Sequence, residues 1–73
     1  MNHLAWNLYL LKLYDSALSV YNDVIKISIK ARMPDMVINS LGNIGTIYRD
    51  LKEYDKAVKF YKKSISSAIE NRS

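Results

Sequence analysis

The residues of this 73-residue sequence that could act as acids, bases or metal ligands are one histidine and a few aspartates. A nucleophilic enzyme needs a Ser or Cys beside a base that a third group orients. His3 has no such residue fixed near it, and it stands close to a terminus, where chains fray. Asp15 and Asp55 are explained as first-turn acids of helices, and no Asp-rich metal-loop spacing is present. The sequence therefore predicts no catalytic residue, no metal site and no cofactor, and so a protein that is not an enzyme.

The charged residues give a net charge of +4, from 11 Lys and Arg against 7 Asp and Glu. Nucleic-acid binding requires a denser basic stripe, so we expect no nucleic-acid partner and interpret the lysines as a solvated face. The apolar runs, such as residues 8–11, are far shorter than the roughly 20 residues of a membrane span. No signal-peptide pattern opens the sequence. We expect a cytoplasmic protein without a membrane partner.

The sequence has no cysteine, so neither a disulfide nor a thiolate metal site can stabilise it. A core of this size rarely supplies more than about 3–5 kcal/mol of stability. Association with neighbouring repeats or with a second chain is the remaining source of stability.

The elements that position these residues are predicted to be helices almost everywhere. Apolar residues recur at spacings of three and four, while Gly occurs twice and Pro once. Pro34 with Asp35 marks one boundary, because Pro favours the first helical turn and Asp complements the helix dipole. Softer breaks fall near 11–13 and 51–53. We expect four helices, at about 2–11, 14–31, 35–50 and 54–71.

The strongest signal is an internal repeat with a period of 40 residues. Nine residues are identical when the sequence is aligned with itself at that offset. They are Leu11, Lys12, Tyr14, Asp15, Ala17, Tyr21, Ile25, Ile29 and Arg32, with their counterparts 40 positions later. Such a period indicates stacked supersecondary units that cannot bury their apolar faces alone. We expect a single all-α domain over 1–73, with repeat one at about 1–33 and repeat two at about 34–73.

Small residues stand where the helices of a repeat should cross. Ala57, Tyr61, Ile65 and Ala68 share one helical face. Ala57 and Gly45 let the two helix axes approach closely, so a large residue at either position should cost roughly 1–3 kcal/mol.

These residues resemble the tetratricopeptide repeat family. Residues 43–48 (NIGTIY), followed by Ala57 and Tyr61, are similar to the family's helix-A "L-G-x-x-Y" and its helix-B "Y-x-x-A" with an aromatic residue. The resemblance covers essentially the whole chain. It implies two tandem helix–turn–helix repeats, four antiparallel helices that form a short piece of α-solenoid.

The sequence departs from the family pattern in two ways. The period is 40 instead of 34 residues, and the extra six residues, near 27–35, should lengthen the flanking helices. Lys12 and Lys52 replace the usual glycine of the hairpin turn, which should leave these turns less sharply specified. Period-40 units of this kind occur in peptide-binding scaffolds and in pheromone-receptor regulators of Gram-positive bacteria.

The resemblance also implies a binding groove along the first helix of each repeat, for another protein or a peptide. In repeat two Asn43 would grip a peptide backbone, because its amide can both donate and accept; the alternative is a merely solvent-facing residue. The groove residues implied in repeat two are Asn39, Asn43, Thr46, Arg49 and Asp50; those in repeat one are His3, Trp6, Tyr9 and Leu10.

The face formed in repeat one is unusually apolar, which is typical of interaction sites. Either a partner binds there or the first helix is buried against a neighbour. Solenoids need polar caps at their ends, and the last helix shows Phe60 and Ile69 on its outer side. We therefore expect a protein- or peptide-binding scaffold that self-associates, as a dimer, or that belongs to a longer array. The alternative is a fragment of a peptide-pheromone-sensing regulator.

Overall fold

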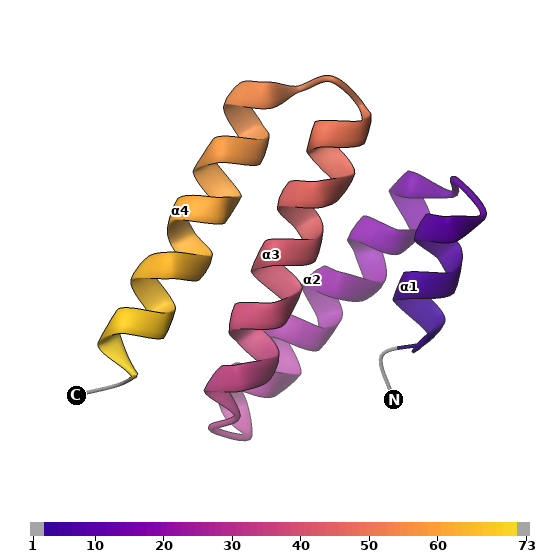
Figure 1. Ribbon diagram of the computed structural model, residues 1–73. Helices are drawn as coiled ribbons and strands as arrows, with labels where there is room; N and C mark the ends of the chain where they lie inside the picture. Colours follow the sequence, from indigo (N-terminus) through magenta and orange to yellow (C-terminus); the bar gives the residue numbers. More distant parts are fainter. Residues whose placement is uncertain (1–2, 72–73) are drawn as a thin grey trace.

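The computed structural model describes residues 3–71 and shows four antiparallel helices (Figure 1). They are α1 (His3–Leu10), α2 (Tyr14–Lys30), α3 (Pro34–Asp50) and α4 (Tyr54–Glu70). Within the described residues there is no strand. The predicted all-α fold is confirmed, and each predicted helix end lies within a residue of the observed one.

The helices pair into two hairpins, which correspond to the two repeats. The first hairpin contains α1 and α2, and the second contains α3 and α4; α3 also packs along α2 and joins the hairpins. α1 and α4 consequently lie at opposite ends of the array (Figure 1).

Helix length accounts for the 40-residue period. α2, α3 and α4 have 17 residues each, and turns of three residues separate them. The extra residues therefore lie within the helices, as predicted, and not in a long connection. None of these three helices has a side-chain N-cap hydrogen bond, but each has an aspartate in its first turn. These carboxylates, Asp15, Asp35 and Asp55, face the positive end of the helix dipole.

The three turns share one tight geometry, which corrects the expectation that the lysine-containing turns are loosely specified. Lys12, Arg32 and Lys52 adopt φ values of 62°, 55° and 63°. This is the left-handed conformation that glycine usually supplies after a helix. In the first turn the Leu13 amide donates to the Leu8 carbonyl at 2.9 Å, and the same 6→1 bond closes the other two turns. The backbone hydrogen bonds therefore specify these turns without glycine.

The core lies between the two hairpins. Ala5, Ala17, Tyr21, Ile44 and Ile47 are almost completely buried and form one cluster. It contains residues of α1, α2 and α3, so it holds the first helix of each hairpin against α2. Partly buried side chains, including Leu18, Ile25 and Phe60, surround it. The expectation that Phe60 lies on the outer side of the last helix is therefore wrong, because its ring stacks on Tyr48 of α3, whereas Ile69 is exposed.

The crossing of α3 and α4 is as close as the small residues predicted. A Cβ atom built on Gly45 would lie 2.9 Å from two ring carbons of Tyr61 and 3.2 Å from the Ala57 carbonyl oxygen. Only a residue without a side chain fits there unless the helices move apart. A hydrogen bond also joins these helices: the Ser64 hydroxyl of α4 donates to the Ile38 carbonyl of α3 at 3.0 Å.

Candidate protein-binding surface

The residues predicted for the binding groove lie on α1 and α3, the first helices of the two repeats, and together they form a candidate surface. We name this surface the A-helix face and define it by Trp6, Tyr9, Leu10, Asn39, Asn43, Arg49 and Asp50. In α1 the rings of Trp6 and Tyr9 are tilted against each other with centroids 4.8 Å apart. Trp6 remains 41% exposed and Leu10 60% exposed. The described part of α1 thus offers an aromatic and aliphatic surface that no other described helix covers.

A hydrogen bond joins the two repeats across this surface. The Tyr9 hydroxyl donates to Oδ2 of Asp50 at 2.6 Å, and Asp50 Oδ1 lies 3.5 Å from the Arg49 guanidinium. The hydrogen bond to Asp50 raises the pKa of Tyr9 above its ordinary value, and burial adds to this shift. The structure therefore brings Tyr9 together with Arg49 and Asp50, which come at least 40 positions later in the sequence.

Asn43 is half-buried and lies beside the Tyr21 phenol of α2. Burial raises the pKa of the Tyr21 hydroxyl, while the neighbouring Asn43 amide opposes that shift. The Tyr21 hydroxyl nevertheless has no hydrogen-bond partner of good geometry among the described residues. Asn43 thus lies at the border of the A-helix face with the core, and this residue is less exposed than Asn39, one turn earlier in α3.

Among the predicted groove residues, Thr46 points its hydroxyl toward α4 and not toward the A-helix face. Its hydroxyl donates to the Gly42 carbonyl at 3.2 Å and lies 3.0 Å from the Tyr61 hydroxyl of α4. These bonds commit the hydroxyl to the interior of the second hairpin, so we leave Thr46 out of the A-helix face. The predicted residue His3 begins α1, but its side chain lies outside the described part of the structure.

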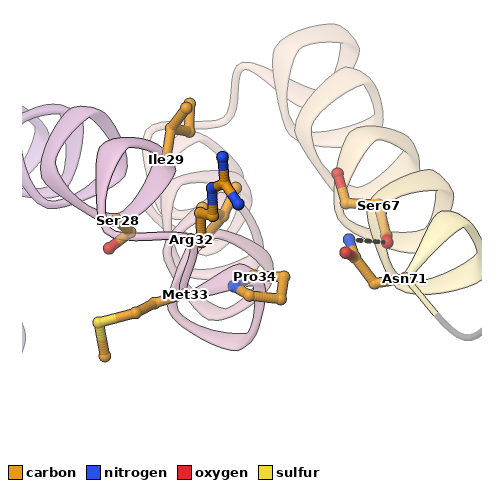
Figure 2. A pocket seen from close by; sticks show the side chains of 8 residues that line it. Ser28, Ile29, Arg32, Met33, Pro34, Ser67 and Asn71 are labelled. Carbon is orange, nitrogen blue, oxygen red and sulfur yellow. Dashed lines mark hydrogen bonds between the residues drawn. The ribbon is translucent and has the colours of Figure 1, made fainter.

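A pocket of about 430 Å³, which the sequence did not predict, opens at the α2–α3 turn (Figure 2). Arg32, Met33 and Pro34 line it on one side, and Ser67 of α4 with Asn71, which follows α4, lines it on the other. The Asn71 amide is already used, because it donates to the Ser67 carbonyl at 2.8 Å. None of the A-helix face residues lines this pocket, so it is a separate feature. The only sequence signal for it is the break at Met33-Pro34.

The described residues include neither a cluster of metal-binding side chains nor a membrane-spanning helix. Between residues 3 and 71 no group of three or more His, Cys, Asp or Glu is placed to hold a metal ion. None of the helices in that range is long and apolar enough to cross a bilayer. What the A-helix face offers is contact area, hydrogen-bonding amides and one cation.

Comparison with known proteins agrees with this geometry. Two antiparallel helix pairs, a glycine–alanine crossing and a 40-residue period are the features of a helical repeat. The profile of the tetratricopeptide repeat matches residues 1–70. Comparisons with curated proteins and with solved structures gave no match. Because the family profile spans nearly the whole sequence, this chain belongs to the tetratricopeptide repeat family.

Proposed function

We propose that this chain is a non-catalytic scaffold that binds another protein or a peptide along the A-helix face. Tetratricopeptide repeats generally mediate protein–protein interactions. The observation that supports the proposal most is the Tyr9–Asp50 hydrogen bond of 2.6 Å. It links α1 to α3, which supports a shared surface that includes the exposed Trp6 and the polar residues of α3. A surface held rigid before binding loses less entropy when the partner arrives.

The A-helix face has the composition of a binding site. Trp and Arg are enriched among residues that dominate binding energies, and the face contains Trp6 and Arg49. Asn39 and Asn43 supply amides that can pair with a peptide backbone. We also propose that the scaffold acts in the cytoplasm and associates with further copies of itself.

Peptides selected from a random display library against the immobilised chain provide the test. Fluorescence anisotropy then gives the affinity of a selected peptide for the wild type and for Trp6→Ala. We expect the loss of Trp6 to cost roughly 2 kcal/mol or more of binding energy while helicity is kept. Ile69→Ala is the control, since Ile69 is a large apolar residue 64% exposed on α4 and lies outside the A-helix face. Equal losses in both variants, or none in Trp6→Ala, would contradict the proposal.

A second candidate is a segment of a regulator that senses a short secreted peptide. The 40-residue period and the position of Asn43 favour it. Titration of short synthetic peptides into the wild type and Asn43→Ala tests this candidate by calorimetry. It predicts that the variant binds more weakly, and equal affinities would count against it.

A further inference from the structure

The outer side of α4 carries an apolar stripe that is open to solvent. We define the α4 stripe as Tyr54, Val58 and Ile65, which are 59%, 48% and 60% exposed. These residues lie on one face of the helix, because their spacings of four and seven correspond to nearly whole turns. Three large apolar side chains in a row on one helix are more than the scattered exposure expected of a surface.

The first repeat shows what this stripe is built to contact. The equivalent residues of α2 are Tyr14, Leu18 and Ile25, and all three are partly buried against the core. They are covered in a hairpin array in which α3 packs along α2. Within residues 3–71 no helix packs on α4 in the way that α3 packs on α2. The α2 residues thus lie beside a following helix, and Tyr14 also has the ring of Tyr9 with its centroid 6.1 Å away, whereas no described helix follows α4.

α1 has exposed apolar residues at the positions through which α3 packs on α2. Ile44 of α3 is 1% exposed in the cluster that includes Tyr21 of α2. Its equivalent in α1 is Leu4, which is 60% exposed, and Leu11 beyond the end of α1 is 69% exposed. α1 contains no Asp, Glu, Lys or Arg. An apolar contact with this helix would therefore bury no Asp, Glu, Lys or Arg of α1 itself.

We propose that a second copy of this chain stacks head to tail on the first, so that its α1 covers the α4 stripe as α3 covers α2. Stacking of this kind rests on the self-association in the proposed function and is independent of the peptide groove. Each copy uses two different surfaces at opposite ends of the array. Such heterologous contacts do not close after two copies unless a ring forms. The expected product is consequently a stack that lengthens with concentration, where the sequence alone had suggested a dimer.

Sedimentation velocity of the 73-residue chain over a wide concentration range tests the proposal. Leu4→Lys blocks the α1 surface, the head of each copy, and Ile65→Lys blocks the α4 stripe, its tail. Both residues are 60% exposed, so both variants should fold. Each change should raise the concentration needed for association about tenfold or more. Ile69→Lys is the matched control: Ile69 is 64% exposed, but its equivalent Ile29 stays 62% exposed although α3 packs along α2. Circular dichroism checks the helix content of all variants.

A mixture of the two blocked variants gives the sharpest result. Leu4→Lys retains an intact tail and Ile65→Lys an intact head, so together they should form a one-to-one complex and stop there. A wild type that remains monomeric at all concentrations would overturn self-association altogether. Association lost in only one of the two variants would indicate a symmetric dimer and overturn the head-to-tail arrangement. An equal loss in Ile69→Lys would also contradict it.

Discussion

Tyr21 and Tyr61 occupy equivalent positions in the two hairpins, yet their hydroxyl groups have different surroundings. The Tyr61 hydroxyl lies 3.0 Å from the Thr46 hydroxyl, and the two groups form a hydrogen bond. The Tyr21 hydroxyl is buried and has no such partner among the described residues. The residue of α1 that corresponds to Thr46 is Trp6, which has no hydroxyl and is 41% exposed.

This difference indicates how the two hairpins divide their roles. The second hairpin satisfies its own Tyr61 hydroxyl and keeps its helices close through Gly45. In the first hairpin Trp6 stands where such a partner would be and is presented to solvent on the A-helix face. Departures from good local packing are expected at functional sites. The first hairpin thus exposes an aromatic ring where the second has a hydroxyl partner, while residues of both hairpins form the core.

The largest predicted effect breaks the close crossing of the second hairpin. Gly45→Val places a branched side chain where even a Cβ atom would lie 2.9 Å from the Tyr61 ring. We expect a loss of roughly 1–3 kcal/mol in the free energy of unfolding, measured by urea denaturation.

Gly42→Ala is the control for this variant, since its new Cβ would meet only the Ser64 hydroxyl at 3.7 Å. It should raise stability by about 0.5–1 kcal/mol, because alanine favours the helix. Equal destabilisation by both substitutions would show that the crossing is not what requires glycine at position 45.

The next prediction compares how much the hydroxyl groups of Tyr21 and Tyr61 contribute to stability. Tyr61→Phe removes a paired hydroxyl and should cost about 0.5–1.5 kcal/mol. Tyr21→Phe removes an unpaired buried hydroxyl and should be neutral or stabilising. The same urea denaturation series measures both changes. Equal losses in the two variants would contradict the assigned difference between the hairpins.

A smaller effect concerns the feature that the hairpins share. Lys12 and Lys52 have φ values of 62° and 63°, which are unfavourable for residues with a side chain. Replacing either by glycine should increase the free energy of unfolding by about 0.5–1 kcal/mol at each site. The midpoint of thermal unfolding should rise accordingly. Differential scanning calorimetry measures the two gains. A loss of stability in either variant would count against the left-handed turn.

The smallest predicted effect is a change in the response to alkaline pH. The pKa of Tyr9 is raised above 10.0, chiefly by the hydrogen bond to Asp50. This bond therefore contributes fully below pH 10 and is lost as the pH rises through the raised pKa. Tyr9→Phe should show a shallower loss of stability above pH 10 than the wild type. Identical pH profiles would mean that the bond between the repeats does not contribute to stability.

Much of the fold could be predicted because local rules and the repeat agree. The 40-residue period, Pro34 and the small residues Gly45 and Ala57 predicted the helices and their close crossing. The turns could not be predicted as well, because lysine does not signal a left-handed conformation. The available signal was the recurrence of a cation at 12, 32 and 52, which appears at half of the repeat period.

The candidate surface could be predicted only as a set of residues on the first helices. The Tyr9–Asp50 bond and the orientation of Thr46 depend on how α1, α3 and α4 are rotated against one another. Neighbouring residues point in directions about 100° apart around a helix. A modest rotation of a helix about its own axis therefore decides which neighbour a polar side chain meets. Tertiary packing sets that rotation, and a period in the sequence does not encode it.

The most direct test of the proposed binding surface is a ¹⁵N–¹H correlation spectrum of the labelled chain, at a low concentration, with and without a display-selected peptide. We predict that the changed resonances cluster on the A-helix face, above all the Trp6 indole and the amides of Asn43 and Arg49. The outer residues Val58 and Ile65 should remain unchanged. Shifts confined to the α4 stripe, or to the pocket near Arg32, would show that the partner binds elsewhere and would contradict the assignment of the A-helix face.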